Sequence, residues 1–303
     1  MNDIQKKILQ KISGIMNIPK GAYNIRINGS SIGSGSTEDI SIVPKENNAG
    51  MDIYIKPGTK HEHVHIPVII SQGGIGETVY NDFHIGENAD VTIIAGCGIH
   101  NNEKAASRHD GIHTFHIAEN ARVVYREKHY GEGSGQRILN PVTNVYMEPG
   151  SYMEMDTVQI EGVDSTKRIT RAELKDGAKL VIKEKLMTHE RQTAETEFLI
   201  NLDGKESATT VSSRSVAKGD SRQIFLSKIN GNASCMGHSE CDAIIMDNAG
   251  VQAIPEITAN HSEASLIHEA AIGKIAGEQI IKLMTLGLDE EESIEQIING
   301  FLK

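Results

Sequence analysis

Short runs in which apolar and polar residues alternate fill most of the chain, and helical spacing is confined to its two ends. Typical runs are Asp52–Ile55, Ala89–Ile94, Arg122–Tyr125 and Lys179–Ile182. A period of two residues predicts β-strands, because successive side chains of a strand point to opposite faces. We therefore expect strands from about residue 24 to residue 267.

A small turn recurs in front of many of these runs. It reads Gly86–Ala89, Ala118–Ala121, Glu148–Ser151, Lys175–Ala178, Leu202–Lys205, Asn230–Ala233 and Met246–Ala249. Asn and Gly suit such turns because they tolerate positive φ. A strand–turn unit that returns about every 30 residues is typical of a β-solenoid, whose coils must stack to bury their apolar faces. The hairpin signals Asn28-Gly29 and Asn230-Gly231 leave a β-sandwich as the alternative.

Both ends of the chain carry helical patterns. Residues 4–16 place apolar side chains on one helical face, and a second stripe begins at Ile272 and stops at Gly287. Asp289 and Glu292 then form the capping signature of a third helix. The terminal helices are expected to cover the open ends of the solenoid, since an uncovered edge strand pairs with other chains. Docking of a partner protein is an equally good reason for the two C-terminal helices.

These patterns predict an all-β fold, a right-handed parallel β-helix with a short N-terminal helix and a C-terminal two-helix region. The expected parts are an N-terminal helix in 1–20, a β-helix core in 21–267 and a helical region in 268–303.

Charge and cysteine usage narrow the class of protein. The net charge of −11 and the scattered Lys and Arg residues argue against a nucleic-acid partner. The first residues lack a long apolar core, so we expect neither a signal peptide nor a membrane span. Cys97, Cys235 and Cys241 have no disulfide-framework spacing. We expect a cytoplasmic protein with free thiols.

Two enzyme-like motifs stand in unsuitable contexts. His61–His65 matches the His-Glu-x-x-His zinc motif, which works only on a helix, yet flanking prolines and a Val-Ile-Ile run predict a strand there. An exposed histidine ladder and a three-histidine metal site remain open. Gly29–Gly33 matches Gly-x-Ser-x-Gly, but more loop follows it where a nucleophile elbow needs a helix. Nucleotide-binding motifs are absent from the sequence, and we predict that the chain is not an enzyme.

Two segments contain residues that bind iron or zinc. Cys241 and the pair His268-Glu269 supply thiolate, imidazole and carboxylate. They converge if their strands share one face of the solenoid, although strand parity also allows Cys241 to point into the core. On the opposite face parity places Ile244 and Met246, which suggests contact with another subunit. A second, His-rich segment at 95–129 contains Cys97 and is open to a metal, a catalytic or a purely solvated reading.

The C-terminal residues resemble a known family. Cys241-Asp242, Pro255, Leu266–Ala270 and Gly287–Phe301 appear in the order and spacing of the SufB/SufD family, the scaffold of the SUF iron–sulfur cluster assembly machine. The resemblance implies a β-helix that dimerises, C-terminal helices that bind a SufC-like ABC ATPase, and a labile iron–sulfur cluster at the dimer interface. Glu269 falls on the family's functional glutamate. The family's interface cysteine falls at Ala249, so that thiol is missing.

The resemblance leads us to expect a minimal homodimeric scaffold. Its labile iron–sulfur cluster would be bound by Cys241 with His268 or Glu269, and Cys97 is a reserve candidate that handles sulfur on its way to the interface. One alternative is a SufD-like structural partner without a cluster of its own. Another is a carbohydrate-active β-helix enzyme, which the aromatic content of 4% disfavours.

Overall fold

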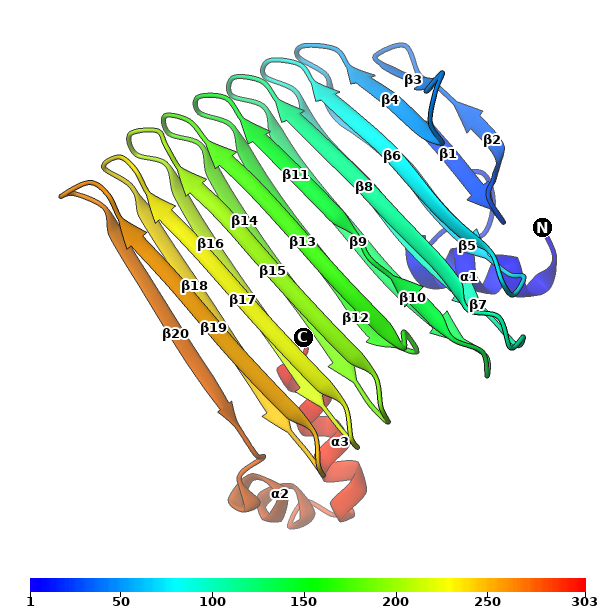
Figure 1. Cartoon of the computed structure of the whole chain (residues 1–303), viewed down its shortest axis with the longest axis vertical. Coiled ribbons are helices and arrows are strands. Elements are labelled where there is room, and N and C mark those ends of the chain that lie inside the picture. Colours follow the sequence, from blue (N-terminus) through cyan, green and yellow to red (C-terminus); the bar gives the residue numbers. More distant parts are fainter.

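The computed structural model describes residues 1–303 apart from the side chain of Glu161. The chain forms a flattened, mostly parallel β-solenoid of about eight turns, in which two sheets of ten strands face one another (Figure 1). The solenoid expected from the recurring turns is confirmed, and the β-sandwich alternative is wrong.

The strands of each sheet follow one another along the solenoid axis. The first sheet contains, in spatial order, β2 (Ser30–Gly35), β1 (Ala22–Ile27), β5 (Lys60–Ile70), β7 (Asp90–His100), β9 (Arg122–Glu132), β12 (Tyr152–Glu161), β14 (Lys179–Thr188), β16 (Ala208–Ala217), β18 (Met236–Ile245) and β20 (Ser265–Gly273). The second contains β19 (Gly250–Ala259), β17 (Arg222–Gly231), β15 (Thr193–Leu202), β13 (Ser165–Leu174), β10 (Arg137–Leu139), β8 (Ser107–Ile117), β6 (Gly76–Ile85), β4 (Gly50–Ile55) and β3 (Ile40–Pro44), with β11 (Val142–Met147) also between β8 and β13.

The recurring turns fix the length of each coil. Asn88 and Asn120 have φ of 57° and 56°, and Gly150 and Gly177 take the same left-handed conformation at equivalent places. Strands of neighbouring coils pair in register, apart from one irregularity between β5 and β7 and one between β9 and β12. All ten residues of β16, for example, lie in register with those of β18. Side chains at equivalent positions therefore stack in rows along the solenoid.

The core lies between the two sheets and is built from alternate residues of every strand. Ile, Val, Leu and Met dominate it, and aromatic rings stack along it. The rings of Phe83 and Phe115 lie 4.6 Å apart, and those of Phe198 and Phe225 lie 5.8 Å apart. Each such side chain, when fully buried, contributes roughly 1.5–3 kcal/mol relative to exposure.

The N-terminal helix α1 (Asp3–Ser13) packs on the outer face of the first sheet. Asn2 is its N-cap, and its side chain accepts a hydrogen bond from the backbone N–H of Gln5. Ile8 and Ile12 face the sheet at Gly98, where a Cβ would lie 2.1 Å from Ile8 Cγ2. Glycine at this position lets the helix approach the strands closely.

The two predicted C-terminal helices are present as α2 (Gly277–Met284) and α3 (Glu290–Phe301), and Asp289 with Glu292 forms the expected capping box. The strand β20 continues to Gly273, past the expected start of the helical region at 268, because its residues pair with β18 up to that point. Among the described residues, no helix is long and apolar enough to cross a membrane.

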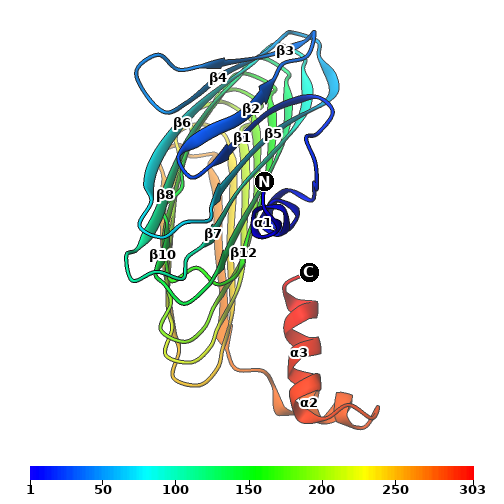
Figure 2. The ribbon, with the colours of Figure 1, turned by 90° about the vertical axis from the view of Figure 1, so that its right-hand side faces the viewer.

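The terminal helices do not cover the ends of the solenoid. Figure 2 shows α1 and α3 on the same side, against the outer face of the first sheet. Ile298 of α3 and Leu302, which follows the helix as its C-cap, are buried against Val216 of β16. Ile244 and Met246, expected to contact another subunit, pack in this same cluster. The expectation of end-capping helices is therefore wrong, because their apolar stripes match an apolar patch on the sheet.

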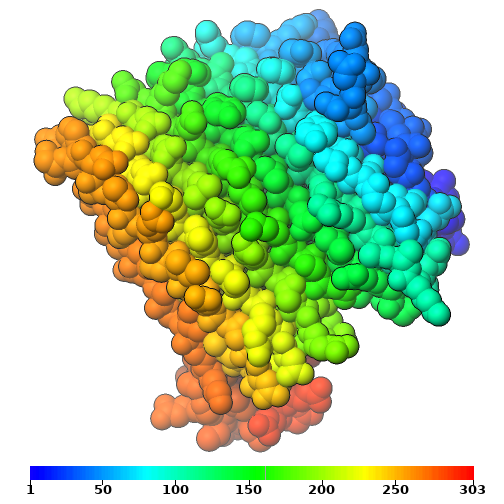
Figure 3. Space-filling view, in the orientation of Figure 1, coloured from blue at the N-terminus to red at the C-terminus, as the bar shows by residue number. Residues whose placement is uncertain are grey.

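Each coil contacts mainly its neighbours, and in Figure 3 the chain appears as successive bands in sequence order. At the C-terminal end the last coil, β19 and β20, has a neighbour on one side only. Most of its residues are half-buried or exposed, in contrast to the alternating burial of the preceding coils.

Candidate functional site

The open C-terminal end of the solenoid presents apolar side chains to solvent. Ile257 of β19 lies in register with the core residue Ile229 but is 45% exposed, because no further coil covers it. On β20, Ile267 is 51% exposed and Ile272 is 39% exposed. An exposed, apolar edge of this kind favours pairing with another chain.

Cys241 lies beside this end, inside the core. Its neighbours in register are Ser213 on β16 and Ala270 on β20, and its side chain is 1% exposed. Burial, reinforced by the charge of Glu184, raises the pKa of the Cys241 thiol to about 12. The free thiol is thus protonated at neutral pH, and a metal ion must displace its proton to be bound.

His268 occupies the same inner face one strand further out. It lies in register with Ser239, one two-residue step along the strand from Ala270, the neighbour of Cys241. Both of its ring nitrogens are buried and have no hydrogen-bond partner among the described residues. Burial and the nearby His238 lower the pKa of His268. The ring is therefore a neutral imidazole with a free lone pair, which is the form that binds metals.

Glu269 lies on the opposite face of β20. Its Oε2 is 3.5 Å from Nε2 of His238, and it is in register with Glu240 on the outer surface. Of the two partners considered for Cys241, the structure brings His268 to the same face and leaves Glu269 outside. Among the described residues, no group of three or more His, Cys, Asp or Glu side chains is arranged to hold a metal ion.

Cys97 lies on β7, far from the open end. Four strands of the first sheet separate it from Cys241 on β18, so five strand spacings give a separation of ~24 Å. The two cysteines cannot bind one cluster within a chain. Cys97 is buried next to His129 of β9, and burial raises the pKa of its thiol well above the ordinary value.

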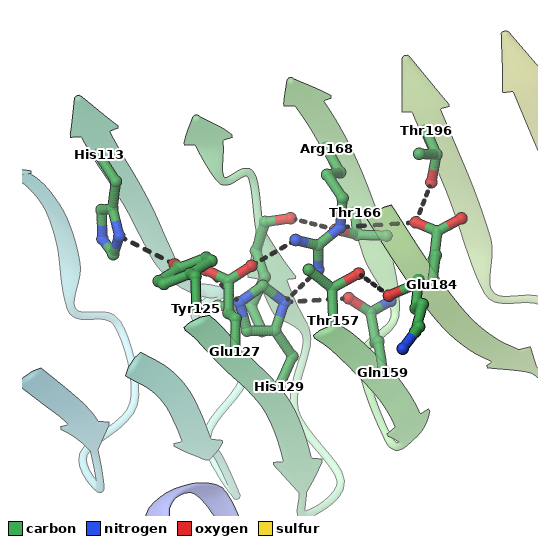
Figure 4. A network of polar contacts seen from close by, with 12 residues as sticks. His113, Tyr125, Glu127, His129, Thr157, Gln159, Thr166, Arg168, Glu184 and Thr196 are labelled. Atoms are coloured by element: carbon green, nitrogen blue, oxygen red, sulfur yellow. Dashed lines mark hydrogen bonds and ion pairs between the residues drawn. The ribbon is translucent and has the colours of Figure 1, made fainter. Parts of the chain in front are cut away.

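A row of inward-facing polar side chains reaches Cys241 from the middle of the solenoid. The row occupies one register position on consecutive strands of the first sheet, namely Glu127, Thr157, Glu184, Ser213 and Cys241. Ser213 donates a hydrogen bond of 2.7 Å to one carboxylate oxygen of Glu184. The other oxygen accepts a hydrogen bond of 2.9 Å from Thr196 (Figure 4). The interior between the sheets is therefore polar along this line.

Arg168 of the second sheet holds the charges of this row together. Arg168 donates a hydrogen bond to Glu127, and its Nε lies 3.6 Å from a carboxylate oxygen of Glu184 (Figure 4). His129 lies within hydrogen-bond distance of Arg168, and the hydroxyl of Tyr125 donates a hydrogen bond to Glu127. Burial alone would raise the pKa of Glu127, but Arg168 and His129 hold it well below its ordinary value. Sequence reasoning missed these residues. The available signal was a charged residue at an inward position of an alternating run.

The two enzyme-like motifs are accounted for by the fold. His61 has a φ of 57° at a bulge of strand β5, so the His-Glu-x-x-His segment is not helical and a zinc-protease site is excluded. His63 and His65 remain on one face, with ring centroids 6.4 Å apart. Ser31, the central serine of Gly29–Gly33, lies in strand β2, so no nucleophile elbow forms.

The family follows from comparison with known proteins. Residues 70–301 match the family model described as "SUF system FeS cluster assembly, SufBD core domain". The chain belongs to the SufBD family. The matched range contains most of the solenoid, the open end and both C-terminal helices. Membership of the SufBD family indicates a role in iron–sulfur cluster assembly.

Archaeal relatives of this SufBD protein carry the same family name. An iron–sulfur cluster assembly SufBD family protein of Methanocaldococcus jannaschii is 26% identical over 82% of this chain and 79% of its own length. One from Pyrococcus horikoshii is 26% identical over 96% of this chain and 84% of its own. A third, from Archaeoglobus fulgidus, is 29% identical over 75% of this chain, but the match spans 61% of that relative, less than two thirds of its length.

Proposed function

We propose that this SufBD protein is a homodimeric scaffold on which a labile iron–sulfur cluster is assembled at the open ends of two solenoids. The observation that carries the proposal is His268, a half-buried imidazole whose two nitrogens are buried and unpartnered, on the strand next to Cys241 at an uncovered sheet end. Buried polar groups are nearly always hydrogen-bonded, so an orphaned imidazole needs a ligand or a second chain to explain it.

A two-fold dimer accounts for the apolar end of the solenoid. A second copy that pairs with β19 or β20 would satisfy the free backbone groups of the edge and cover Ile257 and Ile272. A two-fold axis uses the same surface on both chains and closes the assembly. This placement of the interface replaces the one expected at Ile244 and Met246, which contact α3.

Such a dimer doubles the ligands that one chain offers. One Cys241 and one His268 from each chain supply two thiolates and two imidazoles, enough for a cluster. A site with fewer than four thiolates holds iron and sulfide less tightly, as an assembly site must in order to release its product. Glu269, on the outer face of its own chain, joins this site only if the partner brings it there.

We also propose that a SufC-like ABC ATPase docks on α2. Ile281 of α2 is 62% exposed, Leu286 just after the helix is 76% exposed, and α2 has no buried residue among those described. Ile298 of α3 and the following Leu302 are instead buried on the sheet. The chain itself is proposed to be a cytoplasmic protein without enzymatic activity, since its sequence has no phosphate-binding motif.

A SufD-like structural partner without its own cluster is the second candidate. Ala249 at the family's cysteine position and the burial of Cys241 favour it. Anaerobic co-purification with the cognate ATPase, followed by iron and sulfide analysis, separates the two. A scaffold retains both elements in a stoichiometric complex, whereas a structural partner binds the ATPase and retains neither.

A further inference from the structure

A second group of metal-binding side chains surrounds a small cavity in the N-terminal half of the solenoid. The cavity has a volume of about 10 Å³, room for about one water molecule. Cys97 lines it from β7, His129 from β9, and His109 and His113 from β8, on either side of Gly111. All four of these side chains are at least nine-tenths buried.

The rings of His109 and His113 are held so that their Nε2 atoms face this cavity. Nδ1 of His109 is 3.4 Å from a carboxylate oxygen of Glu77, and Nδ1 of His113 is 3.0 Å from the hydroxyl of Tyr125. Neither Nε2 has a hydrogen-bond partner among the described residues. The contact with Tyr125 sets the tautomer and orientation of His113 for a metal at Nε2, whereas Nδ1 of His109 has no hydrogen-bond partner among the described residues.

Gly111 provides the space into which both nitrogens point. A Cβ on this residue would lie 3.2 Å from Nε2 of His113 and 3.3 Å from Nε2 of His109. The backbone of Gly111 is not in the left-handed region, so its conformation does not require glycine. The missing side chain serves instead to leave room between the two rings.

We propose that this cavity binds one divalent first-row transition ion, of the type of Zn²⁺ or Co²⁺, through Nε2 of His109, Nε2 of His113 and Sγ of Cys97. Imidazole and thiolate donors together suit these ions. Among the described residues these donors are not assembled into a metal site, so the side chains must shift toward the space over Gly111 when the ion binds.

Binding is balanced in charge and in protons. The Cys97 S–H bond breaks, its proton leaves to solvent, and a sulfur–metal bond forms, with no change in oxidation state. The nearby buried charges are the carboxylates of Glu77, Glu127 and Glu184 and the guanidiniums of Arg26 and Arg168, one negative charge in excess. A divalent ion with one thiolate adds one positive charge and makes the interior neutral.

The inference goes beyond the proposed function, because the cavity and the Cys241 site lie on strands ~24 Å apart. A thiolate that holds an ion does not carry sulfur at the same time. An ion at Cys97 therefore removes this residue from the sulfur-handling role that the resemblance suggests.

Cobalt titration of the full-length chain tests the site. A Cys241→Ser chain is treated with chelator, dialysed and titrated with Co²⁺, so the cluster thiol cannot contribute. We expect one cobalt per chain with an intense thiolate-to-cobalt charge-transfer band and an increase in the melting temperature. A Cys97→Ser substitution in this chain should abolish the band.

Gly111→Ala tests the geometry without removing a ligand, because its methyl group occupies the space between the rings. We expect it to weaken Co²⁺ binding by at least about tenfold. Gly76→Ala on β6, where an added Cβ meets nothing within 4 Å, is the matched control and should bind cobalt normally. Absence of the charge-transfer band, its survival in Cys97→Ser, or equal binding by the two alanine variants overturns the proposal. None of these outcomes depends on cluster assembly at Cys241.

Discussion

Cys241 and His268 point into the solenoid from neighbouring strands at its open end, whereas Glu269, the next residue after His268, points outward to His238. We therefore expect His268→Ala to lower the iron retained after anaerobic reconstitution several-fold. Glu269→Gln should lower it much less within the same dimer. Equal losses in both variants would mean that the partner chain brings Glu269 into the site.

The C-terminal helices give a prediction that separates docking from folding. Ile281→Asp on α2 should abolish co-purification with the ATPase and leave the unfolding transition unchanged, because Ile281 is 62% exposed. Ile298→Asp on α3 should instead cost at least about 2–5 kcal/mol of stability, since Ile298 is 2% exposed and a carboxylate would lie unpaired there. Urea unfolding and pull-down of both variants provide the check. ATPase binding that survives Ile281→Asp would rule out α2 as the docking surface.

The open end gives a prediction on oligomeric state. Light scattering at micromolar concentration should show a dimer for the native chain and a monomer for Ile257→Asp, because the charge would lie in an apolar interface. Ile224→Asp on β17 is the control, as its side chain is similarly exposed, at 38%, but one strand away from the edge. A native monomer, or a dimer that tolerates Ile257→Asp, would place the interface elsewhere.

Much of the fold was predictable because its determinant is local. Several coils begin with a turn residue of positive φ, and Asn88, Asn120, Gly150 and Gly177 mark these turns in the sequence. The placement of α3 was not predictable, because an apolar stripe does not say which surface it covers.

The interior polar network could not be predicted from the sequence for a related reason. Glu127, Arg168 and Glu184 look solvent-exposed until the register of three different strands places them on the inner face. The bulge at His61 was equally hidden, since one added residue changes which histidines share a face. Cys241 and His268 were found because thiolate and imidazole bind metals and the resemblance pointed to them, but only the register separates His268 from Glu269.

Buried His113 predicts a pH-dependent stability. Burial, together with the charges of His109, His129 and Arg168, lowers the pKa of His113 from 6.5 to about 4, against the opposing charge of Glu127. Below pH 6.5 His113 is protonated in the unfolded chain, but in the folded chain it stays neutral until about pH 4. The stability of the folded chain therefore falls as the pH drops through this window. The loss should be at most about 3 kcal/mol.

His113→Asn isolates this contribution. Urea unfolding between pH 7 and pH 4, in the presence of chelator, should show a smaller loss of stability for the variant than for the native chain. Parallel profiles would mean that His113 is protonated in the folded state or that another group compensates. The difference between the two chains cancels the contribution of the other histidines.

The central claim is that Cys241 supplies the thiolate of a cluster built at the dimer interface. The most direct test is anaerobic reconstitution with iron and sulfide, with visible absorption and bound iron compared for the native chain, Cys241→Ser and the control Cys235→Ser, whose thiol is also buried in the core. The account predicts full cluster in the native chain and in Cys235→Ser, and little or none in Cys241→Ser at unchanged dimer content. Undiminished absorption and iron in Cys241→Ser would contradict it.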